Sequence, residues 1–195
     1  MTMQAQGAMA RASTGARPAI FPRTKKAEYQ SAFLEAYQHY YTKVFAYIYS
    51  RTTNVELTKD LTAEVFEKAY VKGHSVREPA AYSTWLFMVA KNVVVGHYRK
   101  LQREHRGINR ARESVSLGEN PHDPEESALH TEAVAQLMRK VKDLSTRDQE
   151  LLALKFEGEL TYAEIGRVMK LSEVNVRVSV FRALKRLRKL MEASV

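Results

Sequence analysis

The feature that most restricts the fold is a series of helix start and stop signals in LTYAEIGRVMKLSEVNVRVSVFRALKRLRK, residues 160–189. Thr161, followed three residues later by Glu164, forms a capping box and predicts a helix of only about nine residues through Val168. Ser172 is a second N-cap residue, so a longer helix is expected to begin after a three-residue connection. This succession of short helix, tight turn and longer helix is typical of a helix-turn-helix.

The longer helix is basic and has two different faces. At about 100° per residue, one set of side chains falls on a face that should pack inward: Val176, Val180, Ala183, Leu184, Leu187 and Met191. The opposite face should carry Asn175, Val178, Ser179, Arg182, Lys185 and Arg186, with Arg177 and Phe181 on its flanks. Its amide, hydroxyl, guanidinium and apolar groups suit contact with phosphates and base edges in the DNA major groove. An ordinary surface helix with a basic outer side is the alternative interpretation.

Upstream of this motif, the same kind of signals predict two further helices. One passes through Val134, Leu137, Met138 and Val141. The other begins after Ser145, which with Asp148 resembles a capping pair, and should end at Gly158. Together with the helix-turn-helix, these helices would form one small domain over residues 133–195.

The N-terminal half of the chain predicts a three-helix bundle. Aromatic and aliphatic residues recur every three or four positions between Glu28 and Ser50, which places them on one face of a first helix: Phe33, Tyr37, Tyr40, Tyr41, Val44 and Ile48. A second helix carries Leu57, Leu61, Val65 and Ala69 and should stop near Gly73. A third should begin at Pro79 and run to about Leu101, with Trp85, Leu86, Val89 and Val93 on its apolar side.

Charge divides the chain into a basic, an acidic and a second basic part. The sequence has 31 Lys and Arg against 22 Asp and Glu, a net charge of +9, which indicates a polyanionic partner. Residues 113–138 nevertheless contain six acidic residues and no Lys or Arg, and Pro121 and Pro124 oppose a helix there. We therefore expect a disordered basic tail at 1–27, a first domain at 28–102, an acidic linker at 103–132 and a second domain at 133–195.

Several functional classes are disfavoured. The chain has no cysteine, so disulfides and thiolate zinc sites are excluded, and a cytoplasmic location is the default. The longest apolar stretch, 85–90, is far too short to cross a membrane. The six histidines have no metal-ligand spacing, and neither a Gly-x-Ser-x-Gly elbow nor a phosphate-binding loop is present. The sequence thus predicts no enzyme activity, no catalytic residue, no metal and no cofactor.

Three quoted segments resemble a known family. DLTAEVFEKAY (60–70) and TWLFMVAKNVVVGHYRK (84–100) are similar to region 2 of bacterial sigma factors, and the last sixty residues resemble region 4. The absence of a region 3 between them is typical of the extracytoplasmic-function (ECF) group. The resemblance implies an all-α fold of two small helical domains, a region 2 bundle of three to four helices and a region 4 helix-turn-helix domain, joined by a flexible acidic linker.

The resemblance also implies function and partners. Such a factor binds core RNA polymerase through the β′ clamp helices and the β flap, directs it to −35 and −10 promoter elements, helps to open the DNA and initiates transcription. An anti-sigma factor is a further expected partner, and no direct membrane insertion is expected. In the family the acidic linker threads toward the RNA path of polymerase, although a solvated spacer would have the same composition.

Specific residues acquire expected roles from the matched positions. Core polymerase would be bound by Asp60, Glu64 and Glu67, although a solvated acidic face is the alternative. The −10 element would be bound by His74, Ser75, Arg77, Lys91, Asn92, Arg99 and Lys100, with a flipped base held by the loop of residues 72–80. Asn92 could instead be a buried structural amide. The −35 element would be bound by Thr161, Asn175, Arg177, Val178, Ser179, Phe181, Arg182 and Arg186.

The chain departs from the family pattern at a few of these places. Ala63 stands where Gln is usual, and Lys170 and Val174 replace glycines of region 4. Met88 and Gly96 replace a usual Arg and Asp in region 2. The competing interpretation is a helix-turn-helix regulator that dimerises and binds a duplex operator without polymerase.

Overall fold

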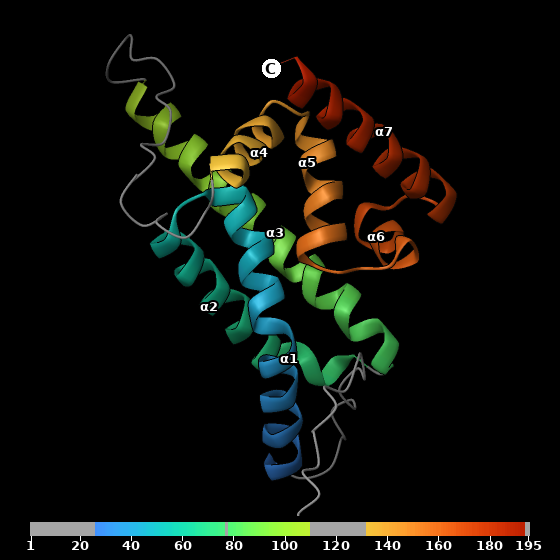
Figure 1. The fold of residues 1–195 in the computed structure, drawn as a ribbon. Coiled ribbons are helices and arrows are strands. Elements are labelled where there is room, and N and C mark those ends of the chain that lie inside the picture. The colour runs from blue at the N-terminus through green and yellow to red at the C-terminus, as the bar shows by residue number, and fades with distance from the viewer. Residues whose placement is uncertain (1–25, 77, 110–131, 194–195) are drawn as a thin grey trace, which may run out of the picture.

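The protein is built from helices alone over the part of the chain that the structure, a computed structural model, describes: residues 26–76, 78–109 and 132–193 (Figure 1). In chain order the elements are α1 (Lys26–Thr52), α2 (Val55–Lys72), the 3₁₀ turn η1 (Gly73–Ser75), α3 (Pro79–Asn109), α4 (Glu132–Lys142), α5 (Thr146–Leu152), the wide helical turn η3 (Ala153–Glu157), α6 (Tyr162–Met169) and α7 (Glu173–Glu192). The predicted all-α class is confirmed. Most of the expected basic tail and acidic linker lies outside the described residues.

Helices α1, α2 and α3 form the N-terminal bundle. Asn54 caps α2, because its side-chain oxygen accepts a hydrogen bond from the Leu57 N–H at 2.8 Å. The bundle encloses Val44, Val65 and Leu86, whose side chains are fully buried. These local signals explain why α2 begins after Asn54 and ends near Gly73, as the sequence predicts.

Two expectations for the bundle need correction. Tyr37, expected in the core stripe of α1, is 37% exposed, because its ring packs beside Phe66 of α2, with the centroids 4.7 Å apart, at the solvent-accessible edge of the bundle. Helix α3 continues to Asn109 instead of stopping near Leu101. The added turns of α3 carry exposed polar side chains such as Gln102 and Arg103, so helix propensity extends α3 beyond its buried stripe.

Helices α4 to α7 form the C-terminal domain. The Ser145 hydroxyl caps α5 by accepting from the Asp148 N–H at 3.1 Å. The helical segment formed by α5 and η3 ends at Gly158, whose N–H donates to the Ala153 carbonyl at 3.0 Å. Helix α7 crosses α4, α5 and α6 and fills the centre of the domain with Val176, Val180 and Ala183.

The buried stripe of α7 is narrower than the sequence predicts. Leu184, predicted on the inner face, is 40% exposed. It lies one position beyond Ala183, and therefore about 100° away around the helix from a fully buried side chain. Because α5 and α6 are short, they cover only a limited arc of α7.

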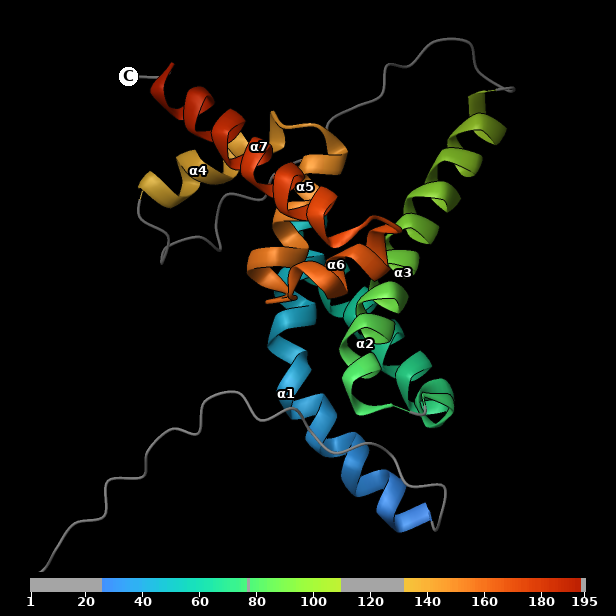
Figure 2. The same cartoon turned by 90° about the vertical axis from the view of Figure 1, so that its right-hand side faces the viewer.

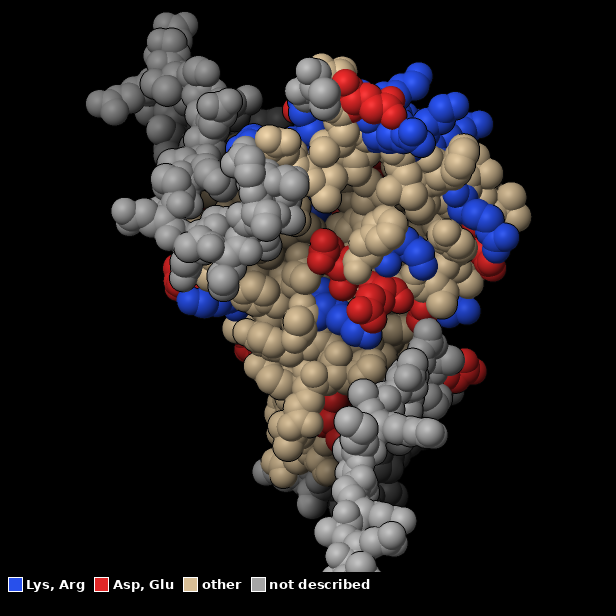
Figure 3. All heavy atoms as spheres, in the orientation of Figure 1, with Lys and Arg blue, Asp and Glu red and all other residues tan. Residues whose placement is uncertain are grey.

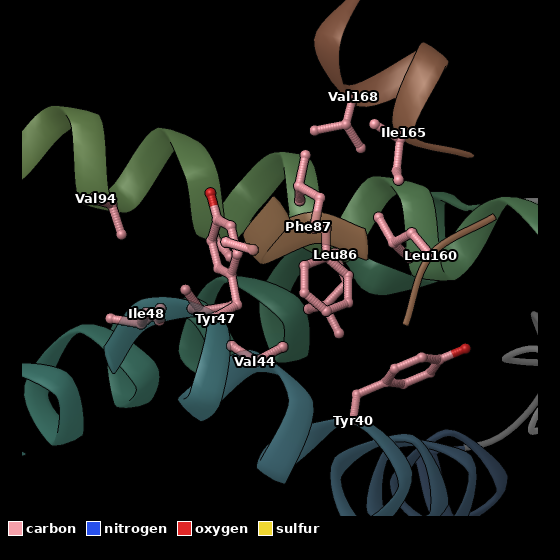
Figure 4. Close-up of a cluster of buried hydrophobic side chains, with 14 of the residues drawn as sticks. Tyr40, Val44, Tyr47, Ile48, Leu86, Phe87, Val94, Leu160, Ile165 and Val168 are labelled. Atoms are coloured by element: carbon pink, nitrogen blue, oxygen red, sulfur yellow. The ribbon is translucent and has the colours of Figure 1, made fainter. Parts of the chain in front are cut away.

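The two helical units share one continuous core. In both views of the ribbon, the continuous segment of α5 and η3 lies against α1, and α6 lies against α3 (Figures 1 and 2). Figure 4 shows Val44 and Tyr47 of α1 facing Phe87 of α3. Leu160 and Ile165 of the C-terminal domain belong to the same buried cluster. All five side chains are at most 2% exposed. The domains are thus docked on each other by an apolar interface.

Candidate nucleic-acid interface

The turn between α6 and α7 has the geometry of a helix-turn-helix. The capping box is complete, since the Thr161 hydroxyl accepts from the Glu164 N–H and a Glu164 carboxylate oxygen accepts from the Thr161 N–H at 2.9 Å. Helix α6 ends at Lys170, which has the left-handed conformation φ 57°, ψ 48°. A Cβ at Gly166 would lie 2.6 Å from the Leu171 carbonyl oxygen, so only glycine allows the chain to turn this closely. Ser172 then caps α7 as predicted.

Helix α7 presents the predicted recognition face to the outside. Basic side chains gather over α7 in the space-filling view (Figure 3). Phe181 is 67% exposed, and Val178 and Val174 are exposed beside it. The other exposed members of the predicted −35 set are Thr161, Asn175, Arg177, Arg182 and Arg186, whereas Ser179 is half-buried. An apolar strip flanked by guanidinium groups suits thymine methyl groups next to phosphates or guanine.

Three residues of the predicted −35 set already have partners. Arg177 pairs with Glu173 at 3.1 Å and lies over the Tyr162 ring at 5.4 Å from its centroid. Arg186 pairs with the buried Asp148 of α5. The Thr161 hydroxyl is used by the capping box. The Glu173 pair keeps the Arg177 guanidinium at the exposed start of α7, whereas Arg186 and Thr161 have clear structural roles.

The predicted −10 residues lie on α3 and η1. Asn92, Arg99 and Lys100 are exposed, so the buried-amide interpretation of Asn92 is wrong. Lys91 is half-buried, and its ammonium group contacts the Met169 sulfur of α6 at 3.4 Å. The C-terminal domain therefore covers part of the basic side of α3.

The loop expected to hold an unpaired base is described in part. His74 and Ser75 are exposed in η1, where the Ser75 hydroxyl donates to the Lys72 carbonyl at 2.7 Å. The His74 ring meets the edge of Tyr29 with the ring centroids 6.3 Å apart. Arg77 lies outside the described residues. The loop thus offers an imidazole and a hydroxyl at the end of the bundle.

The predicted acidic stripe lies on the outer side of α2. Asp60 and Glu67 are exposed, and no ion pair involves either of them within the described ranges. Glu64 is half-buried and pairs with Lys68 one turn later. Two carboxylates are consequently available to a basic partner, and the third is partly neutralised by its own helix.

Sequence reasoning did not identify a ladder of aromatic rings along α1 and α2. Successive ring centroids lie 4.7–6.5 Å apart in a series that contains Tyr29, Phe33, Tyr37, Tyr41, Phe45, Tyr49, Phe66 and Tyr70. The four-residue spacing of aromatic residues in α1 was the available signal, because residues at i and i+4 are neighbours on a helix. The Tyr29 hydroxyl also bonds the Tyr70 carbonyl at the end of α2, which ties the two helices together.

The described residues contain no group of three or more histidine, aspartate or glutamate side chains placed to hold a metal ion. Among the helices of the same residues, none combines the length and the apolar character that a membrane span requires.

A helix-turn-helix domain docked on a bundle with a basic helix and an acidic stripe defines a two-domain, DNA-binding helical protein. Comparison with known proteins then specifies the family. Residues 36–104 match the model "Sigma-70 region 2", and residues 141–189 match "Sigma-70, region 4". The ECF RNA polymerase sigma factor SigM of Bacillus subtilis is 31% identical over 162 residues, which cover 83% of this chain and 96% of SigM. The chain belongs to the ECF sigma factors.

Further similarities agree with this assignment. The ECF sigma factor BldN of Streptomyces coelicolor is 30% identical over 161 residues, 82% of this chain and 60% of BldN. The solved structure of RpoE with the anti-sigma factor NepR from Bartonella quintana has a TM-score of 0.65 and 19% identity, over 82% of this chain and 96% of that one. At this identity the structural similarity supports the fold alone.

Proposed function

We propose that this protein is the promoter-recognition subunit of RNA polymerase for a set of ECF promoters. It binds core polymerase, directs it to −35 and −10 elements and helps to open the DNA. The observation that carries this proposal is the match to both region 2 and region 4 in one chain, since each region supplies a separate exposed basic helix. The protein performs no chemistry of its own in this role, and its place of action is the cytoplasm.

In this proposal α7 reads the −35 element from the major groove. Arg182 and Arg177 contact guanine or phosphate, Asn175 contacts a base edge, and Val178 and Phe181 contact thymine methyl groups. Phosphate contacts position the helix, and base contacts select the sequence. Ser179 contributes at the half-buried edge of the same face.

The −10 element is bound by the bundle. Arg99 and Lys100 contact the backbone of the opening strand, Asn92 reads a base edge, and Lys91 joins them once it is released from α6. His74 and Ser75, with Arg77, hold the unpaired base. Extrusion of that base costs a few kcal/mol of unstacking, which contacts in this loop must offset.

The proposed contacts with polymerase follow from the acidic residues on the outer side of α2. Asp60, Glu64 and Glu67 dock on basic side chains of the β′ clamp helices, and the C-terminal domain binds the β flap. An anti-sigma factor is a further proposed partner. The related structures support this, since RpoE was solved with the anti-sigma factor NepR, and CnrH with the cytosolic domain of CnrY.

The decisive experiment is transcription with purified components. Core polymerase from the source organism is incubated with genomic promoter fragments, with and without the protein, and transcripts are mapped. We expect new start sites that require the protein and opening of the DNA around the −10 element. A dimeric operator-binding regulator would instead protect a symmetric duplex site by itself and leave transcription by core enzyme unchanged, which would refute the proposal.

A further inference from the structure

The outward face of the recognition helix α7 carries an apolar stripe that no other part of the described chain covers. Val174, Val178 and Phe181 are 70%, 42% and 67% exposed. They occupy positions i, i+4 and i+7, so their side chains lie one above another along a single face. Within the described residues, none of the three belongs to the buried core or packs against it. Scattered exposed apolar residues are normal, but an aligned series indicates a surface that another molecule covers.

The stability of the domain does not explain this stripe. At about 100° per residue, the stripe lies on the side of α7 opposite to the buried Val176, Val180 and Ala183. A β-branched valine loses side-chain freedom in a helix, and alanine is the better helix former at an exposed position. The valine side chain at position 174 therefore adds nothing to the packing of the domain, and its contribution is expected in a complex.

Basic side chains border the stripe and indicate the class of partner. Arg177 and Arg182 lie about 40° beyond its two edges around the helix axis. Arg177 is held there by Glu173 at 3.1 Å and by the ring of Tyr162, whose centroid lies 5.4 Å from the guanidinium carbon. Lys185 continues the same face one turn further along and is exposed. Apolar groups between cationic borders fit the major groove of DNA, where phosphates flank the base edges.

One substituent of the bases matches the stripe. The apolar group that base edges present in the major groove is the C5-methyl group of thymine. 5-Methylcytosine carries the same methyl group at the same ring position and differs from thymine in a polar exocyclic group. Valine and phenylalanine side chains have no hydrogen-bonding group, so they respond to the methyl group and not to its polar neighbour. The stripe is therefore suited to pyrimidine C5-methyl groups as a class.

The length of the stripe sets the number of base pairs that it covers. Phe181 lies seven positions after Val174, which corresponds to about 10 Å along a helix. Base pairs stack about 3.4 Å apart, so a helix that follows the groove brings the stripe past about three consecutive base pairs. Recognition helices place their N-terminal residues against base edges, and Val174 is the second residue of α7.

We propose that Val174 is a further specificity-determining residue of this sigma factor, and that Val174, Val178 and Phe181 together read pyrimidine C5-methyl groups in the −35 element. Initiation then depends on thymine methyl groups at these positions, and methylation of a cytosine there supplies the same contact. The inference rests on the proposed function for the placement of α7 in the major groove. It adds a residue and a chemical group to the polar contacts of Arg182 and Asn175.

Removal or addition of single methyl groups tests this inference. Holoenzyme is assembled from core polymerase and the full chain, and a promoter identified in the transcription experiment is used as the duplex. At each position of the −35 element, on either strand, thymine is compared with deoxyuridine and cytosine with 5-methylcytosine. The members of each pair differ by one methyl group. From the effect of burying a methyl group, we expect the methylated member to bind about threefold to fivefold more tightly at neighbouring positions within about three base pairs.

Variants assign this methyl effect to individual side chains. Val174→Ala should abolish the effect at one position and leave it at the others, whereas Val174→Ile, which keeps the apolar contact, should retain it. The matched control Val71→Ala removes a valine that is 58% exposed on α2, and it should leave the effect unchanged at every position. Because Val174 is exposed, its replacement should not alter the midpoint of urea unfolding.

The outcomes distinguish this inference from the proposed function. Equal affinity for both members of every pair, or the same methyl effect in Val174→Ala and wild type, would overturn the inference, as would a protein partner that covers the stripe in place of DNA. If initiation still depends on the −35 element and on Arg182 in that case, the sigma-factor assignment stands. A full chain that supports no promoter-dependent transcription with core polymerase would refute the proposed function, and the inference with it.

Discussion

Replacing Lys170 by glycine should stabilise the protein, although it removes a side chain. Lys170 closes α6 with φ 57°, ψ 48°, the left-handed conformation in which a Cβ crowds the following carbonyl. Its N–H donates to the Gly166 carbonyl, and Leu171 donates to the same oxygen at 2.8 Å, so the turn cannot relax without losing both bonds. Glycine would adopt the same conformation without steric cost.

The magnitude follows from two opposing effects. A non-glycine residue in the left-handed region costs about 1–2 kcal/mol. Glycine costs about 0.4–1 kcal/mol more conformational entropy on folding than a residue with a side chain. The expected net gain for Lys170→Gly is therefore about 0.5–1 kcal/mol, which corresponds to an increase in Tm of about 1–4 °C for a chain of this size.

The assay compares urea and thermal unfolding of the full chain for wild type, Lys170→Gly and Lys170→Ala. Both variants lose the same charge, but alanine keeps the Cβ, so the difference between them measures the strain that glycine relieves, less the conformational entropy that glycine costs on folding. We expect the alanine variant to remain within about 0.5 kcal/mol of wild type, as for most surface substitutions. Equal stability of the glycine and alanine variants would refute the strain argument.

Three further predictions concern DNA, polymerase and pH. Arg182→Ala should reduce initiation that depends on the −35 element by about fivefold to 150-fold in transcription assays, the equivalent of roughly 1–3 kcal/mol for a base contact. The control Lys189→Ala, near the end of α7, should have a small effect. Asp60→Ala should weaken core polymerase binding severalfold in titrations and reduce the salt dependence of this binding. Glu56→Ala should not, because the Glu56 carboxylate already pairs with Lys59. Unchanged core affinity in the Asp60 variant would refute the assignment of α2 as the polymerase-binding surface. Burial, and then the adjacent carboxylate of Glu150, raises the pKa of Tyr47 well above its usual value. The unfolded chain therefore loses this proton first, and the free energy of unfolding should fall above about pH 10. Chemical denaturation at about pH 10–11 should show a smaller decrease in this free energy for Tyr47→Phe than for wild type.

Helix ends were predictable because their determinants are local. Ser145, Thr161 and Ser172 cap the helices that they were expected to begin, and Gly158 ends the segment that it was expected to close. Each signal depends on a side chain and a backbone group within three or four residues, so no tertiary information is required. The recognition face of α7 was largely predictable for the same reason.

The mistakes occurred where packing decides exposure. Periodicity placed Tyr37 and Leu184 inward, but it does not say how much of a helix its neighbours cover, and both side chains are partly exposed. The end of α3 was placed near Leu101 because the apolar stripe stops there. The following residues include good helix formers, such as the exposed Gln102 and Arg103, and the helix continues to Asn109.

Docking of the two domains could not be read from the sequence. Glu150 and Glu164 resemble surface carboxylates, and their partners Tyr47 and Ser83 lie 103 and 81 positions away. Nothing local distinguishes a buried carboxylate with a distant partner from a solvated one. The three-dimensional arrangement was necessary to reveal the contact.

The C-terminal end of α3, which extends beyond its buried stripe, can lengthen the connection between the two domains by unwinding. Within its last part, Gln102, Arg103 and Glu104 are exposed, so helix propensity holds these residues more than packing does. Each residue that leaves the helix lengthens the connection by about 2 Å, the difference between extended and helical rise. Unwinding this end would add on the order of 15 Å, which corresponds to about four base pairs of spacer DNA. Promoters with unequal spacers could therefore be bridged by the same chain, with α3 shortening to compensate.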